Sequence, residues 1–254
     1  MGKRHEKLGV KQTIQRHWMD RTVQMLLAGL SKREIRMELD AYLATQKQSG
    51  GVGVRGPKTY GMAIALLAAW FEPDEELRPF RDDALQLIRE TLPEDCLPLH
   101  WAMLSAAYPF WFHTARVCGR LFNLQDCITQ RQIFDRLREQ YGDRESVIRN
   151  ARYTVRSFVA WGVLKDSKIK GCYEKAFPVN IVDPTLVALL IESALWALPE
   201  GKSELGLLLN HPAFFPFNLP VMSGDSIVLY NSRLESVRYA LDSELLKLKK
   251  NGGG

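Results

Sequence analysis

Apolar residues recur at intervals of three and four along most of the chain, and this spacing predicts a mainly helical protein. Ser31 and Glu34 form a capping-box pattern, which predicts that a break near Gly29 separates two N-terminal helices. Pro109 predicts that the apolar, aromatic stretch 99–122 splits into two core helices. The expected helices in the first half of the chain lie within residues 1–48, at 59–71, at 75–90 and on either side of Pro109.

The second half of the chain continues this pattern with one buried helix and a mixed tail. Asp183 and Pro184 predict the start of an apolar helix that ends near Leu198. In the tail, the spacing predicts a short strand at 226–230 and a final amphipathic helix at 232–248. The expected organisation is therefore an N-terminal helical domain (1–98), a central domain (99–200) and a C-terminal extension (201–254).

Residues 128–177 carry the most informative pattern. Thr129 is a good N-cap for a helix that ends at Gly142, and a second helix is expected at 145–160. A strand after Trp161, a turn at 168–171 and a returning strand at 172–177 complete the pattern. Two helices followed by a ribbon are typical of a winged helix, so the predicted fold is a mainly α helical bundle with an embedded winged helix-turn-helix and a two-stranded β-wing.

The second helix of this segment has a basic outer face. Arg149, Arg152, Tyr153 and Arg156 are spaced so that they can face one direction. In a winged helix this helix enters the major groove, where arginine bonds phosphates and guanine edges. The predicted DNA-binding residues are Arg144, Arg149, Asn150, Arg152, Tyr153, Arg156, Lys165, Lys168 and Lys170.

Charge is divided unevenly along the chain. The chain carries a net charge of +5, of which residues 129–175 contribute 11 Lys/Arg against 6 Asp/Glu. Residues 1–60 hold 12 against 5, whereas residues 61–128 are acidic with 5 against 10. Two separated basic blocks favour two contact surfaces for a polyanion, although charge alternation without a partner is the simpler alternative. The second DNA contact would use Lys32, Arg33, Arg36, Arg55 and Lys58.

Several classes of function lack their motifs in this sequence. Residues 51–56 spell GxGxxG, but polar residues of helical character precede them instead of the strand that dinucleotide binding requires. The histidines are scattered, and the four cysteines include no CxxC pair, so neither a catalytic centre nor a metal site is expected. The expected protein is non-enzymatic, without cofactor or metal. It is expected to be cytoplasmic, because no signal peptide is evident and the longest apolar run, 61–71, is too short to span a membrane.

Residues 20–200 resemble BrxA, the small DNA-binding component of BREX phage-defence systems. The resemblance rests on an N-terminal helical layer and on the segments RGPKTYGMAIALLAAWF, LHWAMLSAAYPFWF and RNARYTVRSFVAWGVL. It implies binding of double-stranded DNA beside larger defence proteins. The arginines of the 145–160 helix and the lysines of the hairpin are the residues to which this role carries over.

Two other functions remain open from the sequence. A winged helix also serves as a protein-docking adaptor, for which the acidic block 61–128 and the apolar segment 211–222 would be partner surfaces. A transcriptional regulator would be a dimer that binds a palindromic site. The pattern of residues does not fix the oligomeric state.

Overall fold

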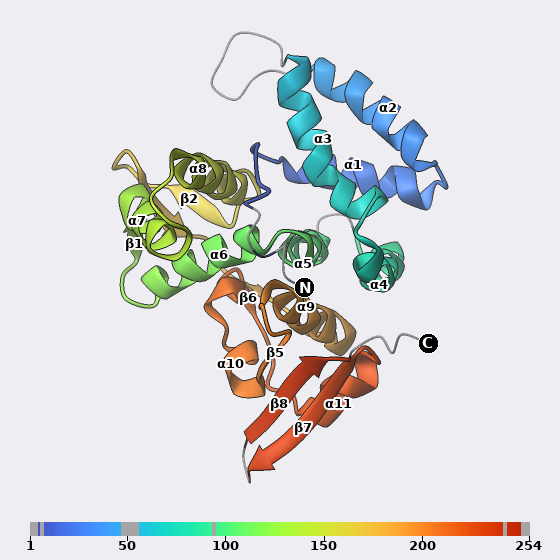
Figure 1. Cartoon of the computed structure of the whole chain (residues 1–254), viewed down its shortest axis with the longest axis vertical. Helices are drawn as coiled ribbons and strands as arrows, with labels where there is room; N and C mark the ends of the chain where they lie inside the picture. The colour runs from blue at the N-terminus through green and yellow to red at the C-terminus, as the bar shows by residue number, and fades with distance from the viewer. Residues whose placement is uncertain (1–4, 6–7, 47–55, 93–94, 241–242, 250–254) are drawn as a thin grey trace.

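The computed structural model describes residues 5, 8–46, 56–92, 95–240 and 243–249, and this part of the chain is mainly helical, as predicted. Its sheets are small, with two or three strands each. Figure 1 shows the N-terminal helices at the upper right, a helix pair with a small sheet at the left and the C-terminal strands below, all around central helices. No helix in the described residues is long and apolar enough to cross a membrane.

In the described residues, the N-terminal layer consists of three amphipathic helices and one strongly apolar helix at Pro57–Phe71. The predicted capping box is present, since the Ser31 side chain accepts from the Glu34 N–H and the Glu34 carboxylate accepts from the Ser31 N–H. The layer packs inward through α1 and α3, which contact the central helix α5. Its elements are α1 (Arg16–Leu27), α2 (Lys32–Ala44), α3 (Pro57–Phe71), the 3-10 turn η1 (Glu75–Leu77) and α4 (Arg78–Glu90).

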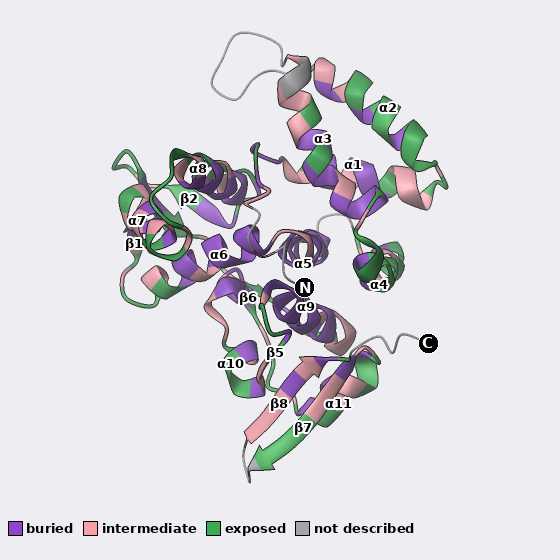
Figure 2. Ribbon diagram, viewed as in Figure 1, coloured by how far each residue is buried: buried purple, intermediate pink, exposed green. Residues whose placement is uncertain are grey.

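The centre of the molecule is formed by α5 (Leu97–Ala107), α6 (Pro109–Phe122) and α9 (Pro184–Ala197). Pro109 begins α6 directly after α5 ends, as the sequence predicted. Nearly every residue of α5 and most of α9 are buried, as the purple ribbons in Figure 2 show. Helices that are apolar all round must be covered on every side, and α5 and α9 achieve this by packing on each other within the other elements.

The segment after α6 alternates short strands with two helices. It comprises β1 (Cys127–Thr129), α7 (Gln130–Tyr141), α8 (Glu145–Ala160), β2 (Leu164–Asp166) and β3 (Cys172–Lys175). The two helices and the hairpin lie where the sequence predicted them. The sheet, however, has three strands instead of two: β3 lies between β1 and β2 and is antiparallel to both. β1 was missed because it is only three residues long and immediately precedes the helix.

The C-terminal part adds two small sheets. β4 (Val179–Asn180) pairs in parallel with β6 (Phe217–Asn218). The larger sheet has the order β5 (Lys202–Glu204), β8 (Ser243–Leu248), β7 (Leu234–Ala240), and it packs against α9 and α11 (Gly224–Tyr230). The remaining elements are α10 (Leu205–Leu209) and the 3-10 turn η3 (Pro212–Phe214).

Both elements predicted for the tail were wrong in type. The strand expected at 226–230 is the helix α11, which the Ser223 side chain caps by accepting from the Ser226 N–H. The helix expected at 232–248 is the hairpin β7–β8. Its apolar residues fit helical spacing in the sequence, but pairing with β5 and packing on α9 favour alternation instead, with Leu246 and Leu248 buried.

The first part of the apolar segment 211–222, predicted as a partner surface, packs into the core, whereas Val221 near its end is 96% exposed. Phe214 and Phe217 are 3% and 5% exposed, and η3 packs closely on α6. A single hydrophobic cluster extends from Val10 to Leu248 and so includes residues of all three predicted domains.

Candidate nucleic-acid interface

Local signals in the sequence position the helix pair α7–α8. The Thr129 side chain accepts from the Gln132 N–H, and the Gln132 side chain accepts from the Thr129 N–H, which makes a second capping box. Gly142 ends α7, and α8 begins at Glu145 after a short turn. The two helices pack on each other and on α6, so the orientation of α8 is fixed by the core.

The inner side of α8 is buried against an aromatic cluster. The Phe158 ring lies 4.9 Å from the Trp101 ring of α5 and 4.8 Å from the Trp111 ring of α6. Trp101 and Trp111 are 0% and 1% exposed, so these aromatics are core residues, as the sequence predicted. Replacing them would remove the platform on which α8 rests.

A second side of α8 is covered by the N-terminal segment 8–14. The Ile14 N–H donates to the Ser157 Oγ at 2.9 Å, and the Trp161 indole N–H donates to the Ile14 carbonyl at 3.0 Å. Gly9 allows this course, because its φ is +71° and an added Cβ would lie 2.6 Å from Tyr108 Cδ1. Among the described residues, this segment and the core therefore leave one side of α8 open to solvent.

The exposed side of α8 carries Arg149, Arg152 and Arg156, which we call the arginine strip. With 3.6 residues per turn, these positions fall within an arc of about 60°. Arg149 and Arg152 have no ion pair or hydrogen bond from their side chains within the described residues. Arg156 differs, because its guanidinium lies 2.6 Å from the Asp166 carboxylate of β2. The strip thus has two uncompensated cations and one that is paired.

The hairpin β2–β3 places three lysines near one end of α8. Lys165, Lys168 and Lys170 are exposed. The turn is closed by the Cys172 N–H, which donates to the Ile169 carbonyl at 3.0 Å. α8 and β2 contact each other and lie in the same left-hand part of Figure 1. Arg144 is also exposed and donates to the Tyr141 carbonyl at 3.0 Å, at the other end of α8.

Two residues predicted with the strip are placed differently. Asn150 is 4% exposed, and its Nδ2 donates to the Ser146 carbonyl at 2.7 Å, so it is buried beside the strip and does not share the exposed surface of the arginines. Its position on α8 falls on the side that faces the N-terminal segment. Tyr153 is half-buried and lies on the same flank, beside the strip.

The second basic block is partly neutralised. Lys32 Nζ and an Arg36 nitrogen each lie 3.0 Å from a carboxylate oxygen of Glu72. The hydrogen bond and charge of Lys32, together with Arg36, lower the pKa of the Glu72 carboxyl. Arg33 is exposed, whereas Arg55 and the Lys58 side chain lie outside the described residues. Two of the predicted cations are thus already paired with a carboxylate.

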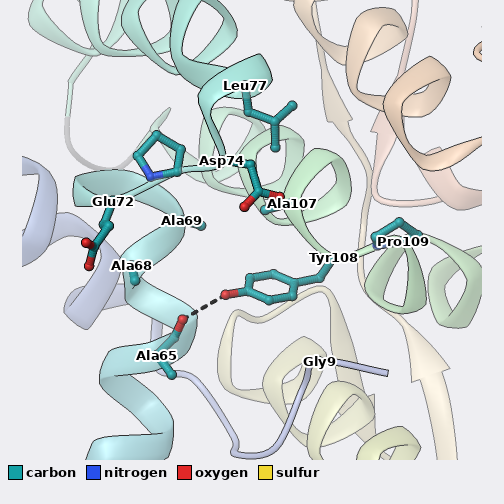
Figure 3. A pocket seen from close by; sticks show the side chains of 11 residues that line it. Gly9, Ala65, Ala68, Ala69, Glu72, Asp74, Leu77, Ala107, Tyr108 and Pro109 are labelled. Carbon is teal, nitrogen blue, oxygen red and sulfur yellow. Dashed lines mark hydrogen bonds between the residues drawn. The ribbon is translucent and has the colours of Figure 1, made fainter. Parts of the chain in front are cut away.

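Two cavities adjoin Gly9. The smaller, of about 220 Å³, lies between α3, the connection from Glu72 to η1, and the junction of α5 and α6, where the Tyr108 hydroxyl donates to the Ala65 carbonyl at 2.7 Å (Figure 3). Apart from Glu72, Asp74 and Tyr108, its lining consists of glycine, alanine, proline and leucine residues. The larger, of about 580 Å³, lies beside the arginine strip and borders the N-terminal segment 8–14.

Two histidines lie where α6 meets its neighbours: His113 is buried and His211 is half-buried. His113 of α6 accepts from the Tyr141 hydroxyl, and the Gln140 amide lies 3.1 Å from the same ring nitrogen. Burial and the Arg116 charge lower the pKa of His113 to about 3. The His211 ring stacks on Phe112 at 4.7 Å, and burial lowers its pKa to about 4. These rings are neutral at pH 7 and join elements of the core.

Comparison with known proteins gives no further guide to the site. No protein-family model, no characterised protein and no solved structure matches this chain. Among the described residues, no group of three or more His, Cys, Asp or Glu side chains is arranged to hold a metal ion. None of the four cysteines forms a disulfide in the described part of the chain, and Cys96, Cys118 and Cys172 are buried. The function must therefore be inferred from the geometry and charge of α8 and its surroundings.

Proposed function

We propose that α6 to β3 is a winged-helix unit through which the protein binds double-stranded DNA without catalysis. In this proposal α8 lies in the major groove, and the hairpin β2–β3 lies against the adjacent backbone. The order helix, strand, two helices, two strands supports the proposal, as does a sheet in which β3 lies between β1 and β2.

The observation that carries this proposal is the pair of uncompensated arginines on the open side of α8. Arg149 and Arg152 are exposed at the middle of that side, on a helix held rigidly from behind. A rigid helix is better suited than a loop to present side chains to base edges and phosphates. The lysines at 165, 168 and 170 extend the same positive charge onto the hairpin.

Acidic residues border the basic surface formed by α8 and the hairpin β2–β3. Asp143 and Glu145 lie at the start of α8, and Asp166 holds Arg156. Arg156 must therefore leave Asp166 before it binds DNA, and it contributes less than the other two arginines. Arg149 and Arg152 should dominate the affinity.

The test is a salt series of fluorescence anisotropy with a labelled duplex. The variant Arg149→Ala/Arg152→Ala should bind about 10-fold or more weakly, since loss of an arginine contact typically costs about 1–3 kcal/mol. Its plot of log affinity against log salt should be shallower by about 1.8, because two phosphate contacts are lost.

The matched control is Arg78→Ala/Arg89→Ala on α4, which removes the same charge from exposed positions away from α8. An equal loss of duplex affinity in both variants would show that net charge alone drives binding and would contradict the proposal. A wild-type protein that binds no duplex at low salt would also contradict it and would favour the adaptor alternative. Preference for one palindrome by about a thousandfold would indicate the regulator instead. The phage-defence context rests on the resemblance alone and remains a prediction.

A further inference from the structure

A groove of about 580 Å³ runs beside the arginine strip, between α8, α3 and the N-terminal segment 8–14. Its volume lies in the range of sites that hold cofactor-sized ligands. None of the described residues that line it carries a carboxylate. The lining residues with distinctive chemistry are Lys11, Met62, Ser146, Arg149, Asn150 and Tyr153.

The wall of this groove is held in place by the body of the protein. The bonds of Ile14 to Ser157 and Trp161 fasten the segment to α8, and Gly9 fits closely against Tyr108. Tyr108 in turn donates to α3 through Ala65, as Figure 3 shows. The groove is therefore formed before any ligand arrives.

Asn150 is the residue in the groove that the fold does not explain. It lies in the middle of α8, where asparagine is a poor helix former. It is 4% exposed, yet its Oδ1 has no hydrogen-bond donor among the described residues. A buried acceptor without a donor destabilises a fold, and leucine would fill the same space without this penalty. Because Nδ2 is bonded to Ser146, it is the unpaired Oδ1 that points to a ligand.

The other residues of the groove match the parts of a nucleotide. Lys11 and Arg149 are exposed cations that suit a phosphate. The half-buried Tyr153 ring and the Met62 side chain offer flat and apolar contacts to a base. An asparagine carboxamide pairs with adenine by accepting from its exocyclic amino group and donating to N7.

We propose that this groove binds one unstacked nucleotide, with adenine preferred. The phosphate lies between Lys11 and Arg149, and the base lies against Tyr153 with its amino group donating to the Asn150 Oδ1. This rests on the proposed function, because it assigns a second mode of contact to the same face of α8. A base within a closed duplex is stacked and paired, so the groove takes its nucleotide from a single strand, from an unpaired position or from free nucleotide.

The experiment compares four labelled or competing probes: a closed duplex, the same duplex with one unpaired adenine, a single strand of deoxyadenosine, and free dAMP. Tyr153→Ala should bind the single strand about 10-fold more weakly, the size expected for loss of one stacked base. Binding of the closed duplex should change less than twofold. The matched control Tyr153→Phe keeps the ring and should bind all probes like the wild type.

A second variant tests the amide independently of the ring. Asn150→Leu should abolish the preference for deoxyadenosine over thymidine single strands. The melting temperature of this variant protein should equal or exceed that of the wild type. A third variant, Lys11→Ala, tests the exposed rim of the groove. It should weaken the binding of the single strand and of dAMP together. Competition by dAMP in the wild type would identify free nucleotide as a source, and competition by polymer alone would identify nucleic acid.

The two proposals fail in different ways. The groove proposal is overturned if Tyr153→Ala and Asn150→Leu bind every probe as the wild type does. It is also overturned if the folded variants lose affinity for all probes equally. Duplex binding that still depends on Arg149 and Arg152 would then leave the proposed function standing. Selective single-strand binding by a protein that binds no duplex would support the groove and overturn the winged-helix proposal.

Discussion

Arg233 lies at a junction of the C-terminal segment with the rest of the protein. Its guanidinium donates two hydrogen bonds to Glu192 of α9, at 2.8 and 2.7 Å, and one to Asp83 of α4, at 2.6 Å. Glu192 is 0% exposed and also accepts from Trp196 and Asn231. A buried carboxylate is tolerated only with such complete pairing.

We expect Arg233→Ala to destabilise the protein by about 3–5 kcal/mol, because it leaves the Glu192 charge buried without its cation. Urea unfolding followed by circular dichroism measures this. Arg238→Ala is the control, since Arg238 is 63% exposed although it contacts Asp225 and Glu244. Its loss should cost no more than about 1 kcal/mol. Similar losses from both variants would show that the buried pair has no special role.

At the level of elements, α6 and η3 approach each other at Gly119. A Cβ added to Gly119 would overlap the Pro212 carbonyl oxygen, which is backbone and cannot rotate away. The close approach brings Phe214 into the core and places His211 on Phe112. Gly119 therefore allows η3 to pack directly on α6.

Gly119→Ala should destabilise the protein by about 1–3 kcal/mol through overpacking. Gly61→Ala in α3 is the control, because nothing lies within 4 Å of an added Cβ there. Alanine favours helix over glycine, so the control should unfold at an equal or higher temperature. Thermal melting of both variants measures the difference. A Gly119→Ala protein as stable as the wild type would mean that η3 can move away from α6 freely.

For the whole molecule, we expect the free energy of unfolding to fall at acidic pH by more than protonation of the carboxylates alone would cause. His113 and His211 have pKa values of about 3 and 4 in the folded state, below the ordinary 6.5 of an unfolded histidine, mainly because of burial. The unfolded chain therefore binds more protons below pH 6.5, and stability falls as the pH decreases from 6.5 towards 4. Each histidine contributes a slope of up to about 1.4 kcal/mol per pH unit.

Urea unfolding at pH 7, 6 and 5 measures this slope, in a range above the titration of ordinary carboxyl groups. His113→Gln cannot titrate and should flatten the slope, although it lowers the stability at pH 7. An unchanged slope in this variant would show that His113 is not responsible. Binding of DNA should be compared at pH 7, where these rings are neutral.

The sequence by itself determined most of the local structure. The capping residues Ser31 and Thr129, the break at Pro109 and the cap at Asp183 fixed helix boundaries, because they act through neighbouring backbone groups. The arc of Arg149, Arg152 and Arg156 also follows from helical spacing alone. Both kinds of prediction depend on residues a few positions apart, which is why they held.

Only the tertiary structure decided what depends on distant partners. It made residues 234–248 a hairpin through pairing with β5, and it buried Phe214 and Phe217 against the core. It paired Lys32 and Arg36 with Glu72, which lies 36 or more positions away in the chain. It also placed Lys11 beside Asn150 and so formed the groove. Spacing along one element cannot reveal these contacts, because each depends on where another segment of the chain lies.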